Sequence, residues 1–520
     1  MNVRSRQVLL SLLSGVLLAA AFPPLPSGPL AWVALVPLLF ALDGADTRRA
    51  AGLGYVFGVA FHVCSLYWIA FHVDIPRLLS IAAWVAASLV LGVYYAAACA
   101  CFRLTARWVG RRWVWFVPFI WVAIEYSRYV SEFAFPWTVI AHSQSRLLGL
   151  IQQADFWGVL GVSLWVVALN VLAFRAMQEV PVNARRATGF AATFALVVAA
   201  SATYGTWRMS ENPTVPARTR IALVQPNIGM DTKWDADEGI RATMDSMMDQ
   251  TMQIPPGSAD LVIWPETAIP DYVVYAPPFS LDSGRNINPR YVAYFDSLTR
   301  HLRAPILSGL PAQDFPRDAQ FNSAALIIPG TSSVQYYDKT FLVPFGERVP
   351  YESAFGFLGK MNLGIARWSP SNRFSVFHSP AGNFGVGICF ESVFPRVMSD
   401  FVRAGADFLV VVTNDAWFGK TSLIYQHAAF ASFRAIENRV WVARCANTGI
   451  SAFYDPWGRR VQEAGIFTRE TLIGTIGPRE KVTPYVLWGD WIVVIAGAVS
   501  LIGVAGGGMA AWKRARRRTS

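Results

Sequence analysis

The 520-residue sequence is poor in charge, cysteine and histidine, and each shortage excludes a class of protein. Charged residues make up 15% of the chain, against roughly a quarter in a typical soluble domain, which argues against an ordinary soluble protein and against disorder. Five cysteines are too few for a disulfide framework in a chain of this length. The six histidines nowhere have the spacing of a zinc site.

Apolar and aromatic residues are abundant instead. Hydrophobic residues make up 54% of the chain and tryptophan occurs 20 times, as expected of a protein that meets the membrane–water interface. Crossing a bilayer takes about 20 mostly apolar residues in a helix. We therefore expect about eight transmembrane helices, near residues 8–22, 30–42, 52–70, 79–102, 113–126, 156–174, 190–204 and 486–512.

Basic residues gather in alternate loops between these runs, which predicts the orientation of the chain. Sixteen basic residues against three acidic ones lie in residues 4–6, 43–49, 103–112, 175–186 and 513–518, whereas the whole chain has a net charge of +11. Excess Lys and Arg marks the cytoplasmic side. Both termini are then cytoplasmic and residues 208–485 are external, so the basic charge reflects topology and does not indicate nucleic-acid binding. Ala19–Ala21 resembles a signal-peptide cleavage site, but Pro23 and Pro24 favour an uncleaved first span.

Four ionisable side chains fall within or beside the apolar runs: His62, His72, Glu125 and Asp155. An intramembrane ionisable group is a candidate functional residue. The alternative is that all four lie at helix ends or pair inside the bundle. Transport would require several of them to converge at mid-depth, which the sequence does not show.

The external segment has the pattern of an α/β layered domain. Strands are predicted near residues 220–225, 261–264, 305–308, 324–328, 384–389 and 408–413, several of them apolar throughout, as in strands covered on both faces. Helices are predicted near residues 235–254, 289–302, 392–404 and 423–445.

Three of the strand ends carry reactive side chains. The strand in residues 261–267 (LVIWPET) ends in Glu266, residues 336–347 (YYDKTFLVPFGE) place Lys339 among aromatics, and residues 385–392 (GVGICFES) place Cys389 at a strand-to-helix elbow. A thiolate is a strong nucleophile, a carboxylate can move protons, and an ammonium with a backbone N–H can stabilise an oxyanion. These three side chains suffice for acyl transfer through a thioester.

Each of these residues also has a simpler interpretation. Cys389 alone is more often an inert buried thiol, and Lys339 an ordinary solvated lysine. Carboxylates such as Glu347, Glu391 and Glu437 could pair with arginines, which is the preferred interpretation for Glu437. His427 with Ser392 or Asp415 could mimic a Ser-His-Asp set, but no Gly-x-Ser-x-Gly elbow is present.

Together, the motifs WPE, DKTFLVPFGE and GICFES resemble the Glu–Lys–Cys triad of the nitrilase superfamily. With the flanking membrane spans, the chain resembles the bacterial apolipoprotein N-acyltransferase family. Further similar segments are residues 224–228 (VQPNI), 233–234 (KW), 413–419 (TNDAWFG), 434–439 (RAIENR) and 447–451 (NTGIS).

The resemblance implies an external αββα sandwich in which Glu266 is the general base, Lys339 the oxyanion stabiliser and Cys389 the nucleophile. It also implies supporting or substrate-contacting roles for Trp234, Glu347, Phe390, Glu391 and Trp417. Where the family often has Tyr, this chain has Phe390, which offers only its backbone N–H. An apolar loop at residues 351–368 is expected to touch lipid and gate entry.

The activity implied is transfer of an acyl chain from a phospholipid, typically phosphatidylethanolamine, to the N-terminal amine of a diacylglyceryl-cysteine lipoprotein, the last step of lipoprotein maturation. No metal or other cofactor is expected, because the donor ester is already activated. The implied organisation is transmembrane helices in residues 1–207, a periplasmic catalytic domain in 208–485, and a last helix with a basic tail in 486–520 of an inner-membrane protein. A membrane-anchored amidase, and a lipid-binding or transport scaffold without activity, are the alternatives.

Overall fold

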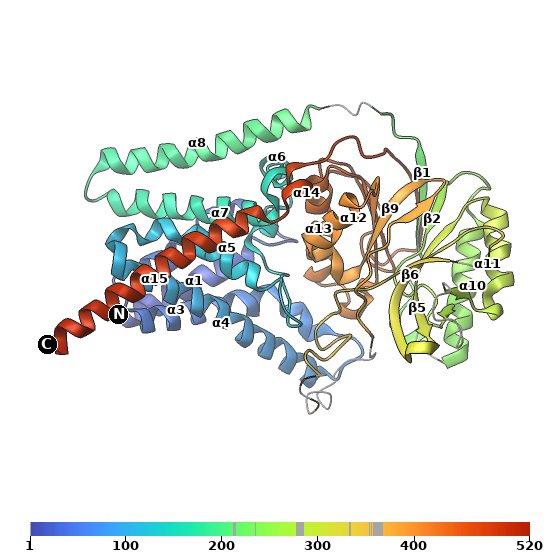
Figure 1. Ribbon diagram of the computed structural model, residues 1–520, viewed down its shortest axis with the longest axis horizontal. Helices are drawn as coiled ribbons and strands as arrows, with labels where there is room; N and C mark the ends of the chain where they lie inside the picture. Colours follow the sequence, from blue (N-terminus) through green and yellow to red (C-terminus); the bar gives the residue numbers. More distant parts are fainter. Residues whose placement is uncertain are drawn as a thin grey trace.

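The computed structural model describes residues 2–211, 215–233, 236–276, 285–331, 334–352, 354, 356 and 368–519. It consists of a bundle of helices and an α/β sandwich that packs against one end of the bundle (Figure 1). Both ends of the chain lie at the opposite end of the bundle, away from the sheets (Figure 1). The architecture expected from the sequence, a helical membrane region joined to an α/β domain, is therefore confirmed.

The bundle contains five helices, within the described residues, that are long and apolar enough to cross a membrane. They are α1 (Val3–Ala20), the continuous segment Arg77–Ser127, α7 (Ala154–Glu179), α8 (Ala184–Met209) and the last helix within Trp491–Arg517. The segment Arg77–Ser127 comprises α4 (Arg77–Val109), η3 (Gly110–Phe116) and α5 (Val117–Ser127), and the last helix, α15, spans Trp491–Thr519.

The remaining apolar runs form shorter elements. The run at 30–42 divides into the 3-10 segment η1 (Gly28–Trp32) and α2 (Val36–Leu42), whose first turn contains Pro37. The run at 52–70 forms the end of α3 (Thr47–Ser65) and then η2 (Tyr67–Phe71). Two short elements, η4 (Ile140–Gln144) and α6 (Leu148–Ile151), precede α7. Runs whose hydropathy is continuous are thus divided into shorter helical elements.

Glycines allow α3 to pack closely between α1 and α4. A Cβ atom on Gly15 of α1 would lie 2.6 Å from the carbonyl oxygen of Phe57, and one on Gly54 of α3 would lie 2.3 Å from that of Tyr95. Small residues at such contacts let helix backbones approach, which is how helices associate in membranes.

The ionisable side chains near the apolar runs have partners of their own. The ring nitrogens of His62 lie 2.8 Å from Gly58 O and 3.1 Å from Thr138 Oγ1, and Glu125 Oε1 accepts a hydrogen bond from the Ile140 N–H at 2.8 Å. Asp155 accepts hydrogen bonds from Tyr204, Arg208 and Arg439 at 2.7–2.8 Å. The ring of His72 packs against the rings of Trp417 and Phe418. These contacts support the structural alternative.

The sandwich has two sheets. The first has the order β14 (Glu470–Ile476), β1 (Thr219–Gln225), β2 (Leu261–Ile263), β5 (Ile306–Asp314), β3 (Val274–Ala276) and β4 (Asn286–Ile287), with β6 (Ala319–Ile327) paired to β5 and β7 (Gln335–Asp338) paired to β6. The second has the order β13 (Arg460–Glu463), β12 (Ala452–Tyr454), β11 (Val442–Ala446), β10 (Phe408–Thr413), β9 (Gly382–Ile388) and β8 (Phe377–Ser379). Strands β1, β2 and β5 run parallel, as do β9, β10 and β11.

Helices cover the outer face of each sheet, which gives four layers. The first sheet is covered by α10 (Ala236–Met252) and α11 (Pro289–Leu302), and the second by α12 (Pro395–Arg403) and α13 (Ser422–Asn438). The helices α12 and α13 lie between the second sheet and the bundle (Figure 1). In β1, Ile221 and Leu223 belong to the core between the sheets, whereas Ala222 and Val224 belong to the core beneath α10 and α11. Coverage on both faces explains why such strands are apolar throughout.

Two helix predictions need correction. The helix expected at 423–445 ends at Asn438, where Arg439 takes a left-handed conformation (φ +51°), and the residues after it form β11. The helix expected at 392–404 starts later, as α12, after the five-residue 3-10 turn η7 (Cys389–Val393). A short apolar run fits a buried strand as well as a helix, so periodicity alone did not separate them.

The bundle and the sandwich meet where α13 crosses a kink in α7. Gly158 at the kink has φ +71°, and the Val159 N–H beyond it donates to Glu437 Oε1 at 2.9 Å. The same carboxylate pairs with Arg434 at 2.8 Å, as the sequence interpretation of Glu437 expected. The ring of Tyr485, in α14 (Pro484–Trp488), fills the space beside the glycine, since a Cβ there would lie 2.4 Å from it.

We expect Gly158→Ala to destabilise the protein, because the new Cβ meets the Tyr485 ring and the backbone conformation disfavours it. Each effect costs about 1–3 kcal/mol. The measurement is the midpoint of thermal unfolding of the detergent-solubilised protein. Gly189→Ala is the matched control, since its Cβ meets nothing within 4 Å in the exposed part of α8. Equal midpoints for the two variants would contradict the packing described at the kink.

Candidate active site

The three reactive residues identified in the sequence lie at adjoining strand ends. Glu266 follows β2 through Trp264 and Pro265, Lys339 directly follows β7, and Cys389 directly follows β9. The Nζ atom of Lys339 lies 3.5 Å from Glu266 Oε1, and the charges of both groups reach the Cys389 thiol and affect its pKa. Three distant stretches of chain thus meet in one place.

Lys339 is a buried cation between two carboxylates. Its Nζ donates to Glu347 Oε1 at 2.8 Å, in addition to its contact with Glu266. Burial alone lowers the pKa of Lys339, but Glu347, Glu266 and the Cys389 sulfur outweigh it, and the pKa is raised above its usual value. Lys339 therefore offers a fixed positive charge beside the sulfur.

Hydrogen bonds on both oxygens hold the Glu266 carboxylate. Its Oε2 accepts from the backbone N–H of Asn414 at 2.9 Å, and its Oε1 from the Asn322 side-chain amide at 2.8 Å. The same amide also donates to Glu347 at 3.0 Å. Asn322 thus fixes the two carboxylates relative to each other and to Lys339.

A second buried lysine, Lys233, contacts the backbone of Glu266. Lys233, at the end of the short helix α9 (Met230–Lys233), donates to the carbonyl oxygen of Glu266 at 3.3 Å and to Thr267 Oγ1 at 3.0 Å. Thr267 has φ +46°, a conformation that needs such support. Burial lowers the pKa of Lys233 to about 7, although Glu266 acts in the opposite direction.

Cys389 occupies a strained elbow in which burial disfavours the thiolate. Its φ of +51° is left-handed, at the point where β9 turns into η7. Burial and then Glu266 raise the pKa of the thiol, while Lys339 and the Thr413 hydroxyl oppose this rise. Cys389 begins a short 3-10 segment and not the first turn of an α-helix, so it gains little from a helix dipole. A base is therefore required to release the thiolate.

Glu391 joins the lysine loop to the cysteine elbow. Its Oε1 accepts hydrogen bonds from Tyr337 OH, Thr340 Oγ1 and the backbone N–H groups of Thr340 and Phe341 at 2.7–3.2 Å. Its Oε2 accepts from the Ile388 N–H at 2.9 Å. One fully buried side chain therefore sets the position of Lys339 relative to Cys389.

The helical bundle contributes a wall of the site. The ring of Phe390 stacks with Phe135 and Trp137, which lie in the loop between α5 and η4. Trp417, in η8 (Asp415–Phe418), accepts a hydrogen bond at its carbonyl oxygen from the Val73 N–H at 2.9 Å. The site thus lies where the sandwich meets the bundle.

Part of the sequence prediction falls outside the described residues. This is so for Trp234 and for residues 353, 355 and 357–367 of the expected apolar loop. In the described part of the chain, no group of three or more His, Cys, Asp or Glu side chains has the arrangement of a metal site.

Sequence reasoning missed Asn322 and Lys233. Asn322 had one weak signal, a polar side chain next to the apolar run Ala324–Ile327, since a buried polar group needs a partner. Lys233 had none beyond its place in the KW segment. Asn414 lay in a segment singled out for its resemblance, but its backbone contact with Glu266 could not be read from the sequence.

Comparison with known proteins covers both parts of the chain. Residues 220–484 match the carbon-nitrogen hydrolase family, and residues 14–172 match the apolipoprotein N-acyltransferase N-terminal domain. The apolipoprotein N-acyltransferase of Geobacter metallireducens is 34% identical, over 95% of this chain and 94% of its own length. That of Chlorobaculum tepidum is 32% identical, over 96% of each chain.

Among solved structures, the chain is similar to Saccharomyces cerevisiae Nit3, a member of branch 10 of the nitrilase superfamily. The identity is 20% and the TM-score 0.37, over 56% of this chain and 97% of that one.

We expect the stability contributed by Lys233 to rise with pH above neutrality. Its folded pKa of about 7 lies below the value of about 10.4 in an unfolded chain, so between these values the unfolded state binds more protons and stability increases with pH. The slope is at most about 1.4 kcal/mol per pH unit. Below pH 7 the lysine is protonated in both states and the slope disappears.

Thermal unfolding midpoints of wild type and Lys233→Met between pH 6 and 9.5 measure this effect. The midpoint of wild type should rise relative to that of Lys233→Met as the pH increases above about 7, because only the wild type has the titrating group. Below about pH 7 the difference between the two midpoints should stay constant. Lys481→Met, at an exposed position, is the control and should follow the wild type throughout. Parallel curves for wild type and Lys233→Met would contradict the assigned proton loss.

Proposed function

The chain belongs to the apolipoprotein N-acyltransferase family, and from this premise we propose how its residues transfer an acyl chain from a lipid to a lipoprotein amine. The enzyme is an acyltransferase with a lipid donor and a lipoprotein acceptor. The observation that carries the mechanism is the meeting of Glu266, Lys339 and the Cys389 elbow at three strand ends. In it, Cys389 is the nucleophile, Glu266 the general base and Lys339 the oxyanion stabiliser.

The first half-reaction forms a thioester. Glu266 takes the thiol proton as the Cys389 sulfur attacks the ester carbonyl of the donor, and the ammonium of Lys339 with the Phe390 N–H stabilises the resulting oxyanion. When this intermediate collapses, the C–O bond breaks and the proton on Glu266 goes to the departing alkoxide. A lysophospholipid leaves, and the acyl group stays on sulfur.

The second half-reaction uses the same groups. The lipoprotein amine attacks the thioester carbonyl, Glu266 takes a proton from the nitrogen, and the C–S bond breaks as the sulfur regains that proton. The products are an amide and free Cys389. The donor ester is activated already, so the proposal requires no cofactor.

The supporting residues position Glu266, Lys339 and Cys389. Glu347 keeps Lys339 charged and oriented, with Asn322 fixing both carboxylates, and Glu391 sets the Lys339 loop against the Cys389 elbow. We assign Trp417 to the substrate side of the junction with the bundle, and Trp234 to a supporting role on the basis of the resemblance alone.

The proposed donor is a phospholipid, with phosphatidylethanolamine as the first choice, and the proposed acceptor is a diacylglyceryl-cysteine lipoprotein. The site lies at the junction between the sandwich and the bundle, and this position supports the proposal that its substrates are lipids. Extracting an acyl chain into water costs about 0.8 kcal/mol per CH₂, and a site next to the bilayer avoids this cost.

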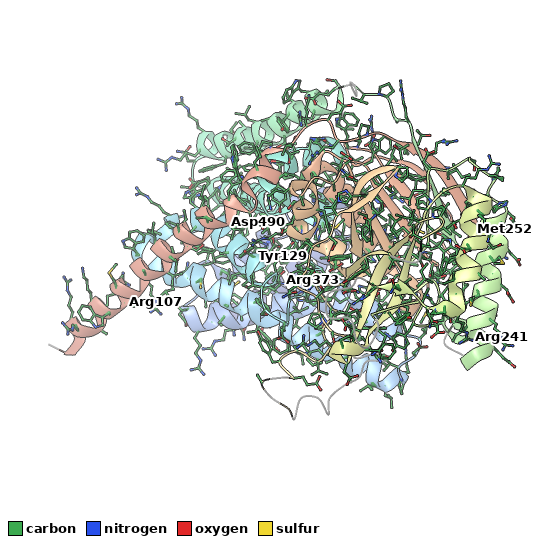
Figure 2. All side chains as sticks on the ribbon, turned by 45° about the vertical axis from the view of Figure 1, so that its right-hand side comes forward. Arg107, Tyr129, Arg241, Met252, Arg373 and Asp490 are labelled. Carbon is green, nitrogen blue, oxygen red and sulfur yellow. The ribbon has the colours of Figure 1, made fainter. Side chains whose placement is uncertain are left out.

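We further propose eight membrane segments, with helices in residues 1–207 and 486–520 and the catalytic domain of residues 208–485 in the periplasm. The segments η1–α2 and α3 then belong to the bundle embedded in the inner membrane. Support comes from Arg107, in the basic last turn of α4, which lies in the bundle away from the sandwich, whereas Arg241 of α10 lies on the far side of the sandwich (Figure 2). Both termini are then cytoplasmic.

The thioester is the test of the mechanism. After incubation with phosphatidylethanolamine, intact-protein mass spectrometry should show wild type heavier by one acyl group, and a lipopeptide amine should discharge it much faster than water does. Cys389→Ser should show no thioester. Glu266→Gln and Lys339→Ala should form it about 10²–10⁴-fold more slowly, because a base or an oxyanion partner is missing.

Cys64→Ser is the control for labelling at another exposed thiol and should behave as wild type. Rapid discharge by water with none by the amine would favour the amidase alternative. Full activity in Cys389→Ala would reject every mechanism through this sulfur.

Topology is tested with an impermeant maleimide on spheroplasts. Cysteine placed by Arg241→Cys should react in intact spheroplasts, and cysteine placed by Arg107→Cys only after the membrane is opened. Both positions are exposed, and the Cys64→Ser parent gives the background. The reverse pattern would place the sandwich in the cytoplasm.

A further inference from the structure

A buried chain of polar side chains lies beneath the Cys389 elbow. Ser392 Oγ is 3.1 Å from His427 Nε2, and His427 Nδ1 is 2.8 Å from Asp415 Oδ1. Arg444 Nη2 donates to the other oxygen of Asp415 at 2.8 Å. Each of these four residues is at most 2% exposed, so this Ser-His-Asp set cannot present a second nucleophile to a substrate.

This row of polar side chains contacts the backbone of Cys389. The carbonyl oxygen of Cys389 accepts a hydrogen bond from Ser392 Oγ at 2.8 Å and lies 3.1 Å from His427 Nε2. Asp415 Oδ1 and the Cys389 carbonyl oxygen both only accept hydrogen bonds, so His427 holds the two together when each of its ring nitrogens carries a proton. His427 is therefore built to hold one specific oxygen atom of the main chain.

Asp415 is itself held firmly. Besides Arg444, the Thr413 hydroxyl donates to it at 3.1 Å. Burial tends to raise the pKa of Asp415, but Arg444 and His427 outweigh this and hold it well below its usual range, so the carboxylate is ionised. The ring of His427 also packs against Trp137, at 5.3 Å between centroids, which leaves it little freedom to turn.

Fixing this carbonyl also fixes the next N–H. A peptide bond is planar and trans, so the oxygen of Cys389 and the N–H of Phe390 point in opposite directions. With the oxygen drawn toward Ser392 and His427, the N–H faces the other side of the elbow. Because Cys389 has an unfavourable positive φ, this peptide would otherwise be free to relax.

We propose that His427, oriented by Asp415 and Arg444, is a positioning residue that holds the Cys389–Phe390 peptide so that its N–H meets the oxyanion. This inference rests on the proposed role of Cys389. His427 acts through the peptide and touches neither substrate nor sulfur. It adds to the proposed mechanism the residue that holds the Phe390 N–H in place.

Two substitutions at one position test this role. His427→Gln keeps an N–H donor near the place of Nε2, whereas His427→Met fills similar space without a donor, and both lose the contact with Asp415. Two rates are measured on each full-length enzyme: thioester formation from phosphatidylethanolamine, and alkylation of Cys389 by iodoacetamide, followed by peptide mass mapping. Alkylation displaces iodide from a saturated carbon and forms no oxyanion.

We expect His427→Met to slow thioester formation about 10–100-fold, because the oxyanion donor is misplaced and not removed, which costs less than its full loss. The rate of alkylation should be unchanged. His427→Gln should recover most of the rate. Ser392→Ala removes the other donor with minimal loss of volume and should slow thioester formation several-fold, again without affecting alkylation. It provides an independent measurement if His427→Met does not accumulate.

The inference is overturned if His427→Met forms thioester at the wild-type rate, if Gln is as slow as Met, or if alkylation slows together with acylation, since the last result means a general distortion of the elbow. A wild-type enzyme that forms no thioester at Cys389 overturns the proposed function itself. Wild-type acylation with an unaffected Met variant overturns the role of His427 alone.

Discussion

The structure depends on one buried ammonium group balanced by two carboxylates from separate segments. Burying Lys339, Glu266 or Glu347 singly would cost several kcal/mol, and only their mutual contact makes this burial tolerable. Burial raises the pKa of the Cys389 thiol and the charge of Glu266 adds to this rise, while the Lys339 ammonium opposes it. In the proposed mechanism, Glu266 takes the thiol proton as an oxyanion forms, and the negative charge moves from the carboxylate to the acyl oxygen. The total charge of the site is unchanged, so little reorganisation is needed.

The helical bundle does more than attach the sandwich to a membrane. Gln426 of α13 accepts hydrogen bonds from the indole N–H groups of Trp68 and Trp137, and the next residue along the helix is His427. Trp137 also stacks on Phe390. The geometry around the nucleophile is thus shared between the two parts of the chain. A sandwich separated from its bundle would lose the packing on Phe390 and His427 that holds the elbow.

The sequence was sufficient for the parts of the site that sit at strand ends. Glu266 follows a buried strand and a proline, and Cys389 ends another strand beside a glutamate, so both patterns are visible in a short stretch of sequence. The resemblance to a known family indicated that the two belong to one site. Asn322 could not be assigned, because its role depends on two carboxylates 56 and 25 residues away in sequence. The sequence argues against a catalytic Ser-His-Asp set at His427, since it has no serine elbow, but it does not show that His427 lies beside the backbone of Cys389. The end of α13 was misplaced because the short run Val442–Ala446, apolar apart from Arg444, is too short for its periodicity to separate a strand from a helix. Hydropathy likewise could not show where Gly110 ends α4, with φ +59°.

Three residues at the proposed site have strained backbone conformations. Thr267 beside Glu266, Phe345 near Glu347 and Cys389 itself all have positive φ, each at a cost of about 1–2 kcal/mol. Each is restrained locally: Thr267 by Lys233, Phe345 through its N–H to Arg348 O at 2.8 Å, and Cys389 through Ser392 and His427. A site so restrained suits a reaction in two halves, because the base, the ammonium and the N–H must serve two acyl carbonyls in succession. The substrates exchange while the protein groups keep their places, and the strain is then the cost of having one geometry that fits both transition states.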